Sequence, residues 1–129
     1  MRILKTTVLL GSLLMITQVH AHAVWQGSAT LIIKKSRVAD FKKAVAKIIE
    51  PTKQEAGCIS YTGYMVMDEK GQETNRFEFH EIWRTKEAML IDHKENSPHM
   101  KAFFQEIKAD TEDSYLESFE LDGKYVTLL

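Results

Sequence analysis

Apolar and polar residues alternate along three stretches of the chain, and a two-residue period is typical of half-buried β-strands. The stretches are residues 24–34, 58–67 and 76–83. In the third stretch, one face of the predicted strand carries Phe77, Phe79, Glu81 and Trp83. Because an unpaired carboxylate is costly to bury, we expect Glu81 to have a hydrogen-bonding partner, an open edge or a raised pKa.

Between and after these strands, apolar residues recur at helical spacing. The first helix is predicted to start after Ser36, which offers an N-cap, and its apolar positions are Val38, Phe41, Val45, Ile48 and Ile49. We expect Glu50-Pro51 to disturb this helix, because proline disfavours helical geometry in the residue before it. A short helix is predicted from Thr85 to about His93. Another is predicted to begin at Ser97-Pro98, a serine cap followed by a proline in the first turn.

The C-terminal residues predict further strand, in two segments divided by a turn at Asp122-Gly123. The order of elements is then β-α-β-β-α-α-β. This order is typical of an α+β domain of the ferredoxin-like, split βαβ type, in which helices cover one face of an antiparallel sheet. The strands carry large apolar groups on both faces, so we expect a second subunit, in a homodimer, or a ligand to cover the other face.

Residues 1–23 differ from the rest of the chain. Arg2 and Lys5 precede an apolar run that ends near Thr17, and small residues at Ala21 and Ala23 form a candidate cleavage site. This pattern predicts a secretory signal peptide, with a buried N-terminal helix as the alternative. The run is shorter than the roughly 20 residues that cross a membrane. We therefore expect residues 24–129 to form one domain that is periplasmic or secreted and not attached to a membrane.

The charged residues exclude some functions. The chain has 17 Lys+Arg and 18 Asp+Glu spread without a basic cluster, which argues against nucleic acid as a partner. Cys58 is the only cysteine, so no internal disulfide can form, and we expect it to be a small buried residue. No metal site is expected, because His93 and His99 lack the spacing that places two ligands on one helical face.

Several motifs resemble those of one protein family. The segment 50–61, EPTKQEAGCISY, resembles the E-P-T-x-x-E-x-G-C-x-x-Y segment of antibiotic biosynthesis monooxygenase domains. Glu81-Ile82-Trp83 resembles their E-x-W strand, and His93 with Ser97–Met100 resembles their H…S/T-P-H-[FM] helix start. The similarity extends from about Gly27 to Leu121, and the quinol monooxygenase branch is the most similar. In the family pattern, the Trp-to-His and His-to-His spacings are each about one residue shorter than in this chain.

The resemblance implies a dimeric α/β barrel with a pocket between the sheet and the helices. It also implies that an electron-rich aromatic, such as a quinol or anthrol, is oxygenated by O₂ without metal, flavin or haem. A deprotonated hydroquinone itself reduces O₂, so the protein need only bind it, favour the anion and exclude water. The candidate catalytic bases are His93, His99 and Glu81. The candidate pocket walls or polar anchors are Trp83, Phe79, Tyr64 and Met65.

Two functions remain open at this point. The first is a cofactor-independent monooxygenase acting on a quinol-like substrate; the second is a non-catalytic dimeric barrel that binds a small aromatic molecule. A base of perturbed pKa beside an aromatic slot favours the first. A pocket filled by its own side chains, with Glu81 paired to Arg or Lys, favours the second. In that case Trp83 is simply core and His99 bonds only locally. Haem degradation, found in a related branch, is disfavoured because the first strand lacks an asparagine.

Overall fold

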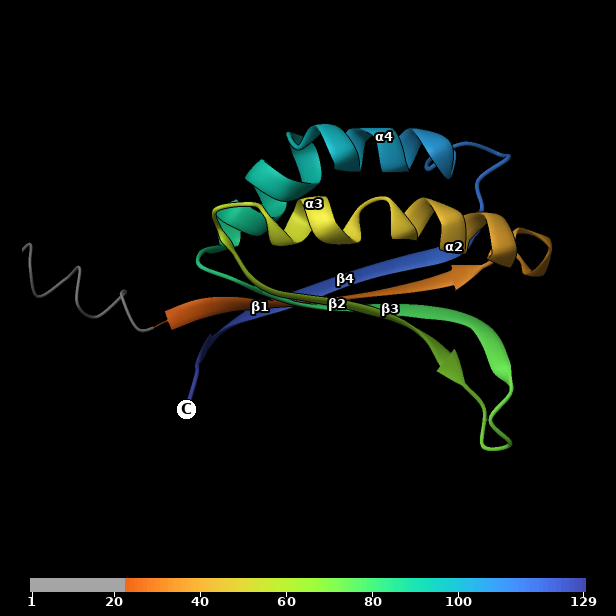
Figure 1. Ribbon diagram of the computed structural model, residues 1–129, viewed down its shortest axis with the longest axis horizontal. Helices are drawn as coiled ribbons and strands as arrows, with labels where there is room; N and C mark the ends of the chain where they lie inside the picture. Colours follow the sequence, from red (N-terminus) through yellow and green to blue (C-terminus); the bar gives the residue numbers. More distant parts are fainter. Residues whose placement is uncertain (1–22) are drawn as a thin grey trace, which may run out of the picture.

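The computed structural model describes residues 23–129, so all of the predicted signal peptide except Ala23 lies outside the described residues. One antiparallel sheet has the strand order β2-β3-β1-β4, and the helices lie over one of its faces (Figure 1). The strands are β1 (Ala23–Ile33), β2 (Cys58–Met67), β3 (Glu73–Trp83) and β4 (Leu116–Thr127). The helices are η1 (Lys35–Arg37, 3₁₀), α2 (Val38–Ala46), α3 (Ile49–Lys53), η2 (Ala88–Glu95, π) and α4 (Pro98–Glu106). The predicted α+β, ferredoxin-like fold with an antiparallel sheet is confirmed.

The core lies between the sheet and the helix layer. Every second residue of β1, from Gly27 to Ile33, is buried, as the alternating pattern predicted. The Phe41 ring of α2 packs edge-on against Phe77 of β3 and Phe103 of α4, with ring centroids 5.2 and 6.0 Å apart. These three aromatic rings join the two layers. Within residues 23–129, no helix combines the length and the apolar character that crossing a membrane requires.

The first helical segment is interrupted earlier than predicted. Ser36 lies in η1, no side chain caps α2, and the break falls at Lys47 and Ile48. Pro51, which was expected to mark the disturbance, lies inside α3. The physical reason is that proline has no N–H to donate to the carbonyl four residues earlier, which belongs to Lys47.

The predicted turn at Asp122-Gly123 is wrong. β4 runs through both residues without interruption, and Gly123 is paired with Gly27 of β1. The glycine is needed for space, because a Cβ at position 123 would overlap the Trp25 ring that lies on it. Gly123 is therefore explained by a close approach between neighbouring strands and not by a turn. The local sequence does not reveal this approach.

The helix-free face of the sheet is more polar than expected. Ser28 of β1 pairs with His80 of β3, whose ring stacks on Tyr64 of β2 at a centroid distance of 5.5 Å. Glu78 accepts hydrogen bonds from the Arg76 guanidinium and the Tyr64 hydroxyl. The middle of this face therefore carries hydrogen-bonded polar groups, and a partner that covers it must satisfy them.

Candidate active site

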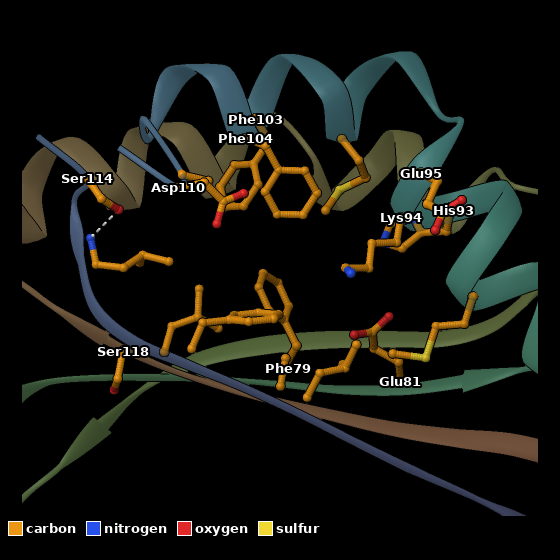
Figure 2. Close-up of a pocket in the computed structure, with 18 of the residues that line it drawn as sticks. Phe79, Glu81, His93, Lys94, Glu95, Phe103, Phe104, Asp110, Ser114 and Ser118 are labelled. Atoms are coloured by element: carbon orange, nitrogen blue, oxygen red, sulfur yellow. Dashed lines mark hydrogen bonds between the residues drawn. The ribbon is translucent and has the colours of Figure 1, made fainter. Parts of the chain in front are cut away.

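A cavity of about 610 Å³ lies between the sheet and the layer formed by η2 and α4 (Figure 2). The part of its sheet side that β1 and β3 form consists of three apolar residues and one carboxylate, Ala29, Leu31, Phe79 and Glu81. Its helix side includes Met89, Met100, Phe103 and Phe104. A cavity of this size whose surface is more apolar than polar is typical of a small-molecule site.

Glu81 is the buried carboxyl group in this cavity. Its side chain is only 4% exposed, and one oxygen, Oε1, accepts a 2.9 Å hydrogen bond from the Trp83 indole N–H. Among residues 23–129, no lysine or arginine forms an ion pair with it. Burial raises the pKa of Glu81 to about 7, a shift that the Trp83 hydrogen bond opposes and the nearby Glu55 charge increases. Near neutral pH the group can therefore both take up and release a proton.

His93 of η2 also lines the cavity, and it is 3% exposed. Its Nδ1 lies 2.5 Å from Oε2 of Glu55, and its ring packs on Trp83 with centroids 4.7 Å apart. Burial lowers the pKa of His93, partly offset by the Glu55 hydrogen bond and charge. A neutral imidazole beside a carboxylate donates its proton there. Nδ1–H therefore points to Glu55, and Nε2 is left as a hydrogen-bond acceptor.

The helix that carries His93 is of an unusual type. The backbone N–H of Asn96 bonds to the carbonyl of Ile91, five residues earlier, so η2 is a π-helix. A π-turn contains more residues than an α-turn, and His93 lies in this helix at the cavity.

The predicted cap at Ser97 has a different role. α4 begins at Pro98 as predicted, but the Ser97 hydroxyl makes no bond to the helix it precedes. It donates a 2.6 Å hydrogen bond to the carbonyl of His93, and Ser97 is buried. This bond ties the start of α4 to the end of η2, and so fixes the backbone that carries His93.

Glu55 is a site residue that the sequence analysis missed. It follows α3, and its Oε2 lies 3.1 Å from Nε2 of His99 as well as close to His93. His99 Nε2 is also 3.2 Å from the hydroxyl of Thr52, which is fully buried. The ligand atoms of Glu55, His93 and His99 all lie within 4.8 Å of one another, so this group has the composition of a metal site. The signal for Glu55 was its place in the EPTKQE motif.

The structure places the other predicted site residues in three regions: the cavity, the core and the opposite face of the sheet. Phe79 lines the cavity with Glu81, whereas Trp83 is fully buried beneath His93 and lies outside the cavity lining. Met65 packs against the core, and Tyr64 points to the opposite face of the sheet. Consecutive strand residues point to opposite faces, so Tyr64 and Met65 cannot share one pocket.

Lys94 is a cavity residue that the sequence pattern did not single out. It follows His93 in η2, and its side chain extends into the cavity toward the side where Glu81 lies (Figure 2). Among the described residues, no carboxylate forms an ion pair with it. Its ammonium group is therefore available to an oxygen atom of a bound molecule.

Trp83→Phe is expected to raise the pKa of Glu81, because the substitution keeps an aromatic ring but removes the hydrogen bond that favours the carboxylate. Carbon-13 NMR of labelled glutamate side chains would follow this titration directly. We expect the midpoint to move above the wild-type value of about 7. A midpoint unchanged or lowered in a folded variant would show that the indole does not control this carboxyl group.

Residues 28–106 match the family model described as antibiotic biosynthesis monooxygenase. The chain belongs to this family. The match runs from β1 to the end of α4, so Glu55, Glu81, His93 and His99 lie inside it and β4 lies beyond it. The uncharacterized protein sll1783 of Synechocystis is 33% identical to this chain over 73 residues. That match covers 57% of the present chain and 46% of the relative, so the chain spans less than half of that protein.

Solved structures share the fold of this antibiotic biosynthesis monooxygenase domain. PA3566 from Pseudomonas aeruginosa superposes with a TM-score of 0.65 at 22% identity, covering 84% of this chain and 99% of its own. A crystal structure of an antibiotic biosynthesis monooxygenase gives a TM-score of 0.60 at 20% identity, covering 81% and 98%. At these identities the similarity establishes the fold, and the function must be argued from the site.

Proposed function

We propose that this protein is a monooxygenase that oxidises a quinol-like, electron-rich aromatic compound with O₂ in the cavity between the sheet and the helices. The observation that carries the proposal is Glu81. Its carboxyl group is buried in an aromatic cavity and forms no ion pair within residues 23–129, and burial raises its pKa to about 7. A base with a pKa near the operating pH is the most effective one for removing a proton from a phenol.

In the proposed reaction, the Glu81 carboxylate takes the proton of a substrate hydroxyl group. The resulting anion gives electrons to O₂, and one oxygen atom forms a bond to a ring carbon. A hydroquinone and O₂ give a hydroxyquinone and water, so one oxygen atom enters the product and the other leaves as water. All four electrons come from the substrate, and no further reductant is needed.

Other cavity residues support this chemistry. The rings of Phe79, Phe103 and Phe104 provide aromatic walls that exclude water from the anion. His93 also lines the cavity, and the Lys94 ammonium is placed to stabilise a developing oxyanion. Cys58 is a poor candidate for catalysis, because burial raises the pKa of its thiol to about 11.

A non-catalytic barrel that binds a small aromatic molecule is the alternative. Two features distinguish the functions. The cavity is not filled by its own side chains, and Glu81 hydrogen-bonds to an indole rather than pairing with Lys or Arg. Both features support the catalytic function, because a binding module gains nothing from a buried carboxyl group that is costly to ionise.

Oxygen uptake by the purified, metal-stripped protein, measured with a panel of hydroquinones and anthrols, tests the proposal. We expect uptake above the rate of autoxidation, with one water formed and one oxygen atom from ¹⁸O₂ entering the product. Absence of uptake together with calorimetric binding of an aromatic would establish the binding module instead. Absence of both would refute a small-molecule role for the cavity.

We also propose that the protein is exported and forms a homodimer through the helix-free face of its sheet. Cleavage after Ala21 would leave β1 whole, whereas cleavage after Ala23 would remove the residue that pairs with Thr127. Sedimentation equilibrium of the mature protein is expected to give twice the monomer mass. N-terminal sequencing of the exported form would locate the cleavage site.

A further inference from the structure

We propose that Glu55, His93 and His99 form a binding site for one Zn²⁺ ion beside the cavity. The three ligand atoms come from three separate elements: the turn after α3, the π-helix η2 and the first turn of α4. Glu55 Oε2 lies 2.5 Å from Nδ1 of His93 and 3.1 Å from Nε2 of His99. The positions of His93 and His99 along the chain do not reveal this group, because Glu55 joins them only in the folded protein.

The dimensions of the group suit a zinc ion. Zinc bonds of about 2.0–2.2 Å to nitrogen and oxygen place two ligands of a tetrahedral ion about 3.3 Å apart. The three atoms lie within 4.8 Å of one another, so small side-chain rotations would bring them to this distance. Two imidazoles and a carboxylate favour zinc over the hard ions Mg²⁺ and Ca²⁺, which prefer oxygen ligands. Water completes the fourth position.

The three side chains are also largely buried, which suits a specific metal site. The side chain of His93 is 4% exposed, whereas those of Glu55 and His99 are 17% and 19% exposed. The buried histidine provides a fixed ligand, and the other two leave a path by which an ion enters. The Trp83 ring against His93 holds that imidazole in position, whereas the Thr52 hydroxyl would give up its contact with Nε2 of His99 when this nitrogen binds zinc.

Zinc would replace hydrogen bonds with metal bonds, and this has a consequence for the cavity. In the metal-free protein, Nδ1 of His93 donates to Glu55 and Nε2 is an acceptor. A zinc ion on Nδ1 requires the lone pair there, so the proton of a neutral ring moves to Nε2. Nε2 of His93, a residue that lines the cavity, then changes from an acceptor to a donor. This consequence rests on the proposed function, whereas the zinc site itself does not.

Zinc binding to the metal-stripped full chain tests the proposal. Calorimetry and elemental analysis after dialysis are expected to give one zinc per chain, and Co²⁺ is expected to give the intense visible absorption of a tetrahedral site. The variants Glu55→Gln and His99→Gln each remove one ligand, and we expect zinc affinity to fall by at least about 100-fold. His80→Gln, which changes an exposed histidine on the other face of the sheet, should bind zinc as the wild type does.

Two results would overturn the proposal: no zinc bound by the folded wild type, or zinc bound equally well by both ligand variants. The second result would assign the zinc elsewhere, for example to His20 and His22 near the N-terminus. Thermal unfolding provides a second measurement, because an ion bound only by the folded state raises Tm with its concentration. All these measurements omit the aromatic substrate, so their failure and a failure of oxygen uptake are distinguishable.

Discussion

Glu81→Gln is expected to lower the rate of oxygen uptake strongly and, above pH 7, to make the protein more stable. Glutamine has the size of glutamate and can still accept the Trp83 N–H, but it cannot take a proton from a phenol. Loss of a general base lowers rates by about 10²–10⁴-fold, and we expect kcat to fall by this factor. For the same reason, the wild-type rate should increase as pH rises through about 7, the pKa of Glu81.

The gain in stability follows from the direction of the pKa shift. Burial raises the pKa of Glu81 from 4.5 to about 7. Below pH 4.5 the carboxyl is protonated in both the folded and the unfolded chain, so its ionisation costs nothing. Between pH 4.5 and 7 only the unfolded chain loses the proton readily, and the free energy of unfolding falls by about 3 kcal/mol in total. Because glutamine does not titrate, the variant does not lose this part of its free energy of unfolding.

Urea unfolding at pH 4.5, 6 and 8 would measure this difference, which should grow with pH and level off above about 7. Glu78→Gln is the matched control, because Glu78 lies two residues earlier on β3 and faces away from the cavity. We expect the control to keep its oxygen uptake. If Glu81→Gln retained wild-type uptake while folded, Glu81 would not be the base.

Trp83→Ala is expected to lower the free energy of unfolding by about 3–5 kcal/mol, the usual loss for a fully buried aromatic residue. The Trp83 ring is 0% exposed and supports both halves of the site, since it packs on His93 and hydrogen-bonds to Glu81. Its removal leaves a cavity and withdraws a hydrogen bond that favours the Glu81 carboxylate. Chemical denaturation at pH 6 would measure the loss.

Trp25→Ala is the control for this prediction. Trp25 is partly exposed at the edge of the core, and its indole N–H is buried without a hydrogen-bond partner among the described residues. Removing it withdraws an unsatisfied donor together with the ring, so we expect less than half the loss of Trp83→Ala. Equal losses in the two variants would mean that Trp83 has no special role in holding the site together.

The sequence was sufficient to predict the fold and the environment of Glu81. Alternation along β3 placed a carboxylate among three aromatic residues, and the structure provides both a partner and a raised pKa. The partner, Trp83, lies two residues away on the same strand face, so even this contact is local. Patterns of period two and 3.6 report on one element at a time, and features within one element were predictable.

Features that depend on contacts between elements were not predictable from the sequence. Asp122-Gly123 was interpreted as a turn, because nothing near it in sequence indicates the Trp25 ring on the neighbouring strand. Glu55 was overlooked because its partners, His93 and His99, are 38 and 44 residues away. Tyr64 was placed in the pocket with Met65, although neighbouring strand positions point apart.

The π-helix η2 means that the distance between His93 and the residues before it, counted along the chain, is a poor guide to membership of this family. A π-turn holds one residue more than an α-turn, so a segment of this kind can change in length by one residue in a way that a fixed-gap pattern would reject. A search for further relatives should therefore allow this segment to vary in length, and should require instead a glutamate positioned to meet both histidines.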